Sequence, residues 1–315
     1  MFNIAVDIGF SNIKSAIEAE GLGLFRSVFS TALAIAPTSA NNDAVIATES
    51  YLYDGITYLC GYKAKSTHVQ DQINCHSNEH LIKYAPVYIA AIAQYVGCVF
   101  GDIGILSVGL PFEMYQPYSQ ALRNVLTSFT VNDTNLTPTQ LNIFCQGAGA
   151  AFAAGVELEI MGNNSLLIDI GRSSVTLVAV KNHIPVALGS RQYFALGMMS
   201  AVEQLARSLS SGTDNCQIKA AEEIIAHTYP GQYDSAQVDR VLTNQANSII
   251  ATLENAYGAQ INKMDNILLT GGGASCIYPY LPNNWRKRVR IQAEPLTANA
   301  RGYFYRSKGL IGGAA

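Results

Sequence analysis

The chain has 315 residues, of which 49% are hydrophobic, and it carries a formal net charge of −3 at pH 7. This length exceeds the size at which a single hydrophobic core usually stops growing, so we expect two domains. The slightly negative charge excludes general electrostatic attraction to nucleic acid or to anionic membranes as a mode of binding.

Six cysteines are spread singly along the sequence without CxxC spacing, which is typical of reduced core residues. No basic segment or secretory core precedes the first predicted strand. The longest apolar stretch, residues 84–100, contains Pro86, Gln94 and Gly97 and falls short of the roughly 20 apolar residues that span a bilayer. We therefore expect a cytoplasmic protein with a buried helix in this stretch and no membrane anchor.

The first predicted strand ends in an acidic residue that is followed by a glycine turn. In AVDIGFSNIKSAI, an apolar run ends at Asp7, and Gly9 follows before a second apolar run. Glycine lets backbone N–H groups approach an anion without a Cβ in the way. Lys14 would add positive charge over phosphates, and Ser11 and Asn12 offer neutral hydrogen bonds. The motif alone also fits a plain β-hairpin.

The chain then alternates predicted strands and helices, which indicates mixed sheets covered by helices. The polar span 60–83 predicts a small subdomain or a loop at the outer end of the first domain. Cys75, His76 and His80 lie close together there, but a structural zinc site normally has four ligands, and no completing partner is nearby. Strands are predicted at residues 4–7, 14–18, 24–29 and 103–108, with a tight hairpin at Asp54-Gly55.

An apolar run at residues 141–145 ends at Gln146, just before the small-residue stretch GAGAAFAAG. A glutamine here would either polarise a water molecule or cap a helix. In phosphoryl transfer the protein mainly positions groups and stabilises charge, so a neutral amide that orients water is a suitable catalytic part. Such a site would hydrolyse its substrate slowly.

The acid and glycine pattern recurs in LIDIGRSSVTLVAV, where Asp169 ends an apolar run and Gly171, Ser173 and Ser174 follow. Two such hairpins facing each other would hold one polyphosphate from both sides. Mg²⁺ prefers oxygen ligands and keeps much of its water, so Asp7 and Asp169 are the expected metal ligands, partly through water.

A third glycine-rich element lies in NILLTGGGASCIYPYL, where an apolar strand at residues 267–270 leads into Gly271, Gly272 and Gly273. A glycine run at a strand end lets a flat ring lie against the backbone. The alternative is a simple turn between a strand and a helix. No G-K-[ST] follows, and no G-x-G-x-x-G follows the first strand, so the usual nucleotide-binding folds are disfavoured.

The second half is predicted to be rich in helices. The basic cluster at residues 286–290 reads as a solvated turn that enters a strand with Val289 and Ile291 facing inward, and contact with nucleic acid or an acidic partner is the alternative. Helices are predicted at residues 198–209, 217–226 and 298–307, and between a cap at Asp234 and a stop at Gly258.

The ordered set VDIGFSNIK, FCQGAGAAFAAG, LLIDIGRSSVTL and LLTGGGA resembles the actin, Hsp70 and sugar-kinase superfamily, whose members hold ATP between two related domains. More narrowly, GLPFEMY (109–115) and ANARGYFY (298–305) resemble the bacterial and archaeal actin-like proteins of the plasmid-segregation ParM and StbA group. The resemblance covers nearly the whole chain. It implies an α/β actin-like ATPase fold, with two related domains of mixed sheet flanked by helices and a nucleotide cleft between them.

The resemblance also implies domain boundaries. Domain I would comprise residues 1–147 and 296–315, with the first phosphate loop and the C-terminal helix. Domain II would comprise residues 148–295, with the second phosphate loop and the adenosine-side glycines.

Site residues are implied position by position. Asp169 would lie near Mg²⁺ and its waters, and Gln146 stands where actins carry a glutamine, and ParM proteins a glutamate, that orients the attacking water. Lys219 resembles an actin lysine beside the nucleotide, and Glu223 is the candidate substitute for a glutamate that this chain lacks at position 220. Phosphate contacts are implied for Asp7, Gly9, Ser11, Asn12, Lys14, Gly171, Ser173 and Ser174, and adenosine contacts for Gly271, Gly272 and Gly273.

Two functional classes follow from the resemblance. In the first, the protein binds ATP or GTP with Mg²⁺, hydrolyses it slowly and polymerises head to tail into cytoskeletal filaments. These filaments would segregate plasmid DNA through a DNA-binding adaptor on a centromere-like site, with no direct nucleic-acid contact.

In the second class, the protein is a small-molecule kinase that phosphorylates a sugar or a similar alcohol. Such kinases usually need an aspartate base, and the sequence offers no clear candidate beyond Asp7 and Asp169, so the filament hypothesis is favoured. An Hsp70-like chaperone is disfavoured because no peptide-holding segment follows the nucleotide-binding portion.

Overall fold

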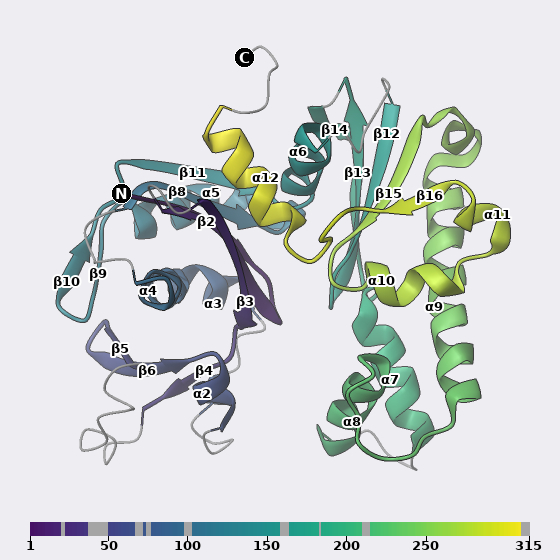
Figure 1. The fold of residues 1–315 in the computed structure, drawn as a ribbon, viewed down its shortest axis with the longest axis horizontal. Coiled ribbons are helices and arrows are strands. Elements are labelled where there is room, and N and C mark those ends of the chain that lie inside the picture. The colour runs from purple at the N-terminus through teal and green to yellow at the C-terminus, as the bar shows by residue number, and fades with distance from the viewer. Residues whose placement is uncertain are drawn as a thin grey trace. The chain divides into compact units, whose positions relative to one another are not determined.

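The computed structural model describes residues 1–19, 23–36, 50–66, 72–73, 77–97, 103–157, 164–182, 184–209 and 215–309. The chain forms two compact units (Figure 1). The first unit comprises residues 1–153 and 299–315, and the second comprises residues 154–298. The predicted domain boundaries fall a few residues earlier in the chain than these. Cys75 and His76, considered above for zinc, lie outside the described residues.

The first unit is built around a five-stranded sheet with the order β11-β8-β1-β2-β3. β1 is antiparallel to β2 and parallel to β8, so it lies inside the sheet and is buried along most of its length. Burial on both faces explains the nearly continuous apolar sequence of this strand. The strands are β1 (Phe2–Ile8), β2 (Asn12–Ala19), β3 (Gly23–Ser30), β8 (Ile103–Leu110) and β11 (Gln140–Cys145).

Successive residues of β1 face two different cores. Ile4 and Val6 belong to a large core shared with buried residues of α4 (Ala85–Tyr95) and α5 (Phe112–Thr127). Ala5 belongs to a smaller core with residues of α12 (Ala298–Ser307). The period of two along the strand therefore lets helices from the middle and from the end of the chain cover opposite faces of one sheet.

Smaller elements complete the first unit. A four-stranded sheet has the order β5-β6-β4-β7, and its β5–β6 turn is the predicted Asp54-Gly55 hairpin, with φ of 52° and 74°. These elements are β4 (Leu33–Ile35), β5 (Ser50–Tyr53), β6 (Ile56–Cys60), α2 (Tyr62–Ser66), β7 (Gln72–Ile73), α3 (Asn78–Lys83), β9 (Phe129–Val131) and β10 (Thr134–Leu136).

Two glycines allow α12 to lie against the start of α6 (Ala148–Val156). A Cβ added to Gly302 would overlap the carbonyl oxygen of Gly149, and one added to Gly149 would overlap the carbonyl oxygen of Asn299. Phe144 and Tyr303 stack beside this crossing with ring centroids 5.2 Å apart. Only residues without a Cβ permit so close an approach of two backbones.

The second unit is built around a five-stranded sheet with the order β14-β13-β12-β15-β16. Its core joins this sheet to α7, α8 and α9. The elements are β12 (Asn164–Ile170), β13 (Ser174–Lys181), β14 (Ile184–Phe194), α7 (Met198–Leu209), α8 (Asn215–Ile225), α9 (Ser235–Tyr257), η3 (Gly258–Lys263), β15 (Asn266–Thr270), α10 (Ala274–Ile277), η4 (Tyr278–Tyr280), α11 (Asn283–Arg286) and β16 (Val289–Ile291).

The predicted helices at residues 198–209 and 298–307 are confirmed by α7 and α12. The capping prediction for α9 is also confirmed, because Asp234 Oδ1 accepts a hydrogen bond of 2.9 Å from the Ala236 N–H, and Gly258 follows the last residue. The predicted helix at 84–100 was too long: α4 ends at Tyr95, and Gly97 adopts a φ of 68°. Across the described ranges, no helix combines the length and the apolar character needed to cross a bilayer.

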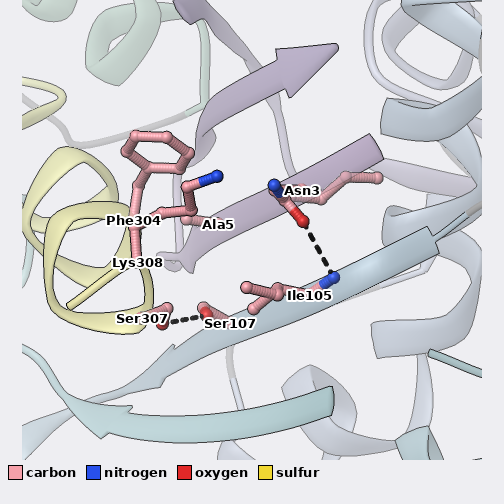
Figure 2. Close-up of a pocket in the computed structure, with 8 residues that line it drawn as sticks. Asn3, Ala5, Ile105, Ser107, Phe304, Ser307 and Lys308 are labelled. Carbon is pink, nitrogen blue, oxygen red and sulfur yellow. Dashed lines mark hydrogen bonds between the residues drawn. The ribbon is translucent and has the colours of Figure 1, made fainter. Parts of the chain in front are cut away.

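A small pocket lies between α12 and the sheet of the first unit (Figure 2). Its wall carries a hydrogen bond of 2.6 Å between the hydroxyls of Ser107 and Ser307, and Asn3 Oδ1 accepts one from the Ile105 N–H. The pocket is a shallow hollow without room for an enclosed water molecule, whereas typical ligand pockets have volumes of roughly 300–1,000 Å³. Because Asn3 and Asp7 lie near opposite ends of β1, this pocket is separate from the site described next.

Candidate functional site

The two predicted glycine turns have the same backbone design. The first turn, residues 9–12, joins β1 to β2, and the second turn, residues 171–174, joins β12 to β13. In the first, Gly9 N–H donates to the Asn12 carbonyl at 3.1 Å, and in the second, Gly171 N–H donates to the Ser174 carbonyl at 2.9 Å. The cross-strand pairs Asp7–Lys14 and Asp169–Thr176 hold equivalent places.

Asp7 is almost fully buried, with 2% of the residue exposed, and both carboxylate oxygens have a donor. Lys14 Nζ donates to Oδ2 at 3.1 Å, and Gln146 Nε2 donates to Oδ1 at 2.5 Å. A buried charge needs such partners, because an unpaired one would pay the full cost of lost hydration. The structure therefore brings three predicted site residues together at the end of β1.

Gly9 makes room for the lysine of this group. A Cβ at Gly9 would lie 2.7 Å from Lys14 Nζ and 3.1 Å from the Asn12 carbonyl oxygen. The ammonium group thus lies across the turn and is paired with Asp7, at the turn where the sequence predicts positive charge over phosphates. In the described part of the chain, the side chains of Ser11 and Asn12 make no hydrogen bond, so both are open to a ligand.

Gln146 is held by its backbone as well as by its side chain. Its N–H donates to the Leu110 carbonyl at 2.7 Å. The cap of α6 comes from Asn299 instead, whose Oδ1 accepts from Gly147 N–H at 2.8 Å and from Ala150 N–H at 3.0 Å. Sequence reasoning missed Asn299, since no local pattern marks a cap that arrives from the far end of the chain.

The Cys145 thiol, next to Gln146, stays in its neutral form. Burial raises the pKa of Cys145 to about 12, which keeps the sulfur protonated at neutral pH.

The second turn is fixed by the start of α7. Its carbonyls at Gly171 and Arg172 accept from the N–H groups of Met198 at 3.0 Å and Met199 at 2.8 Å. These bonds satisfy N–H groups that a helix N-terminus leaves without intrahelical partners. A Cβ on Gly197 would overlap the Arg172 carbonyl, so this glycine, which the sequence did not single out, is needed for the contact.

Arg172 supplies the cation of the second turn, from the position that Phe10 occupies in the first. Its guanidinium forms an ion pair with Glu222 of α8. Lys219, on the same helix, is 78% exposed and lies 3.9 Å from Glu223. An exposed pair of this kind contributes little to stability. The predicted residues of α8 therefore sit beside the acid that contacts the second turn, and Lys219 itself is directed to solvent.

The second turn also leaves hydroxyl groups at its surface. Ser174 Oγ accepts from Gln192 Nε2 at 2.9 Å, whereas within the described ranges the Ser173 side chain makes no hydrogen bond. The Ser173 carbonyl accepts from Ala195 N–H at 3.1 Å.

The glycine run packs against the end of β12. Gly271 has a φ of +83°, and a Cβ there would overlap Asp169 Oδ1. Gly273 N–H donates to the Ile170 carbonyl at 2.9 Å, and a Cβ there would press on Met198. Gly272 is exposed. The three glycines thus differ: Gly271 packs against Asp169, Gly273 packs against Ile170 and Met198, and Gly272 faces outward.

Comparison with protein families supports the relationship suggested by these motifs. Residues 5–149 match the family model for the N-terminal domain of actin-like proteins. Residues 167–283 match the family model for the C-terminal part of MreB-like archaeal actin homologues. The chain belongs to the actin-like proteins. All predicted site residues of this actin-like protein fall inside the two matched ranges.

Solved structures agree with this assignment. A 15-stranded ParM filament from Clostridium botulinum has a TM-score of 0.74 at 19% identity, covering 98% of this chain and 99% of that chain. The archaeal actin homologue Ta0583 has a TM-score of 0.76 at 18% identity, covering 98% of this chain and 100% of that one. These similarities confirm the predicted actin-like fold. A comparison with the curated proteins returns no match.

Proposed function

We propose that this actin-like protein binds a purine nucleoside triphosphate, ATP or GTP, hydrolyses it slowly and assembles into filaments whose stability depends on the bound nucleotide. The observation that carries this proposal is the pair of equivalent turns, each with a carboxylate at the strand end and a glycine after it. One actin homologue of this fold is described in complex with ADP, and a Bacillus thuringiensis ParM with ATP.

Phosphate binding is assigned to both turns. Lys14 supplies positive charge, and Ser11, Asn12 and Ser173 have side chains that are open to a ligand. The remaining proposed phosphate contacts are Asp7, Gly9, Gly171 and Ser174. Lys219, Glu223, Gly271, Gly272 and Gly273 are assigned to the nucleoside.

The carboxylates fit a magnesium ion that accompanies the nucleotide. Mg²⁺ is usually held by one or two carboxylates together with substrate phosphates and water. Both oxygens of Asp7 already have protein donors, so Asp7 would act through water, and the half-buried Asp169 beside Gly271 is the more accessible ligand. When bound, the ion would neutralise charge on the phosphates.

Hydrolysis would depend on Gln146, whose amide orients the attacking water. Head-to-tail contacts between identical subunits generate open filaments when the rotation does not close, and we propose this mode of self-association in the cytoplasm. By analogy with the ParM group, the filaments would move plasmid DNA through a DNA-binding adaptor.

Calorimetry and light scattering test the proposal. Titration of ATP or GTP with Mg²⁺ should give saturable binding, and nucleotide should produce polymer that sediments. Asp7→Ala combined with Asp169→Ala should abolish binding, whereas Asp133→Asn, at an exposed position with a φ of 58°, is the matched control. Absence of nucleotide uptake by the folded wild-type protein would refute the proposal, and acceptor-dependent ADP release with a sugar would indicate a kinase instead.

A further inference from the structure

We propose that a basic patch on the second unit binds the phosphodiester backbone of a nucleic acid, independently of base sequence. The patch lies on η3 and on the segment from α11 to β16, and its exposed members are Lys263, Arg286, Lys287, Arg288 and Arg290. This proposal goes beyond the proposed function, in which nucleic acid is reached through an adaptor, and it does not depend on nucleotide binding.

The basic patch is a local reversal of the charge of the chain. Residues 261–290 contain five of the 20 basic residues and a single acid, Asp265, whereas the whole chain has a net charge of −3. Asp265 is already engaged, because its Oδ2 accepts a hydrogen bond from the Asn164 N–H at 2.8 Å. The net charge excludes general attraction to nucleic acid, but a concentrated basic surface still attracts a polyanion locally.

Neutral groups hold the central arginine of the patch, so its charge is not cancelled. Arg288 Nη2 donates to the Ile261 carbonyl at 2.8 Å, and Nη1 donates to Asn262 Oδ1 at 3.1 Å. The guanidinium also lies 5.5 Å from the centre of the Trp285 ring. In the described part of the chain, no ion pair with a carboxylate is made by Lys263, Arg286, Lys287 or Arg288.

The surroundings of the patch favour phosphate over other acidic partners. Its neighbouring apolar side chains, Ile261, Trp285 and Val289, are all buried. Protein interfaces usually centre on aromatic anchors, and membrane-bound helices present an apolar face. A polar cationic surface without such anchors fits phosphate oxygens, to which arginine, lysine and asparagine side chains all donate.

The patch is separate from the candidate nucleotide site. β12 and β15 run parallel, and the second turn and the glycine run follow their carboxyl ends. The patch lies beside their amino ends, where Asp265 contacts Asn164 and Arg290 Nη2 donates to Asn266 Oδ1 at 2.8 Å. From Asn164 to Asp169, β12 extends about 16 Å at roughly 3.3 Å per residue. Nucleotide and nucleic acid would therefore not compete for the same groups.

Fluorescence anisotropy of the full chain without nucleotide tests the proposal. The probes are fluorescein-labelled DNA and RNA duplexes of about 30 bp with unrelated sequences, and at physiological salt we expect a Kd of about 10⁻⁴–10⁻⁶ M, typical of non-specific binding. Four phosphate contacts should lower the affinity about 100-fold between about 50 and 200 mM salt. Binding to either duplex supports the proposal, and the ratio of the two affinities shows which backbone the patch prefers.

Lys263→Gln combined with Lys287→Gln is the test variant, because neither side chain makes a hydrogen bond within the described ranges. It should reduce the slope of log K against log salt by about 2 and weaken binding about tenfold at about 50 mM salt. Arg207→Gln combined with Arg240→Gln is the matched control, since it removes the same charge from exposed positions of α7 and α9. The control should keep the affinity within about twofold, because distant exposed charges are screened.

Several outcomes would overturn the proposal. One is the absence of binding to either duplex by the folded wild-type protein at about 50 mM salt, and another is equal affinity of the test variant and the control. Displacement of the duplex by poly-L-glutamate at the same charge concentration would assign the patch to an acidic protein instead. Binding to phosphatidylserine vesicles without binding to a duplex would assign it to a membrane.

A measurement on the wild-type protein covers the case in which the variant does not fold. Reductive methylation of lysines, followed by mass spectrometry, should slow at Lys263 and Lys287 when the duplex is added. Lys219 on α8, whose side chain is 78% exposed, is the internal control and should react at an unchanged rate. Equal protection of the three lysines, or protection of none, would contradict binding at the patch.

Discussion

Replacing Gly271 with alanine is expected to destabilise the second unit by more than the backbone conformation alone explains. Gly271 has a φ of +83°, and the left-handed region costs an L-residue about 1–2 kcal/mol. The new Cβ would also overlap Asp169 Oδ1 and crowd the Ile170 backbone. Overpacking of this kind costs about 1–3 kcal/mol, so the total loss should be about 2–5 kcal/mol.

Gly189→Ala is the matched control, since it separates the two contributions. Gly189 lies in the same unit with a φ of +92°, and the atom nearest to an added Cβ there would be the Ala179 Cβ at 3.4 Å, an ordinary contact. Only the conformational cost of about 1–2 kcal/mol applies there. Urea unfolding followed by Trp285 fluorescence reports the second unit, because this residue is the single tryptophan and is 3% exposed. Equal losses in the two variants would refute the reasoning.

Three further predictions concern the first unit. Asn299→Ala should cost about 1–3 kcal/mol, because it leaves two buried N–H groups at the start of α6 without their acceptor, and hydrogen exchange there should accelerate. Lys14→Met should cost about 2 kcal/mol in thermal unfolding, less than the roughly 3–5 kcal/mol of a fully buried pair, since its side chain is 17% exposed and Asp7 keeps one donor. The Lys308 hydrogen bond lowers the pKa of Glu18, so this carboxyl adds stability above its unfolded pKa and loses it as the pH falls through the folded value.

Conservative variants test these three expectations. Asn299→Asp keeps an acceptor for α6 and should preserve slow exchange. Lys14→Arg keeps the charge and should recover part of the loss. Glu18→Gln should flatten the acid side of the stability profile measured by circular dichroism, and a profile identical to wild type would contradict the assignment to Glu18.

Local chemistry explains why much of the fold was predictable. The Asp54-Gly55 hairpin and the Asp234 cap depend on residues within a few positions of each other, and both are confirmed. The Asp7–Lys14 pair was also accessible in principle, because a four-residue turn at positions 9–12 makes these residues cross-strand partners. The resemblance assigns Lys14 to the phosphates, whereas the partner of Lys14 in the structure is Asp7, directly opposite on the neighbouring strand.

Long-range contacts explain what the sequence could not provide. Gly197 is required by the carbonyl of Arg172 in the preceding turn, and Asn299 caps a helix that begins at Ala148, 151 residues earlier in the chain. No short window of sequence, of the length that defines one turn or one helix cap, contains both members of either contact. In the apolar stretch at 84–100, by contrast, the stop signal was local. The prediction followed composition and placed the helix end beyond Gly97, whereas the helix ends before this glycine.

The return of α12 to the first unit has a consequence during synthesis on the ribosome. Residues 154–298 must be translated before α12 emerges, which takes about 7–30 s at roughly 5–20 residues per second. Through that interval the nascent first unit lacks both the cap of α6 and the aromatic rings that cover one side of its central strand. Chaperones that bind apolar surface would therefore have access to this face of the sheet only until α12 emerges and packs against it.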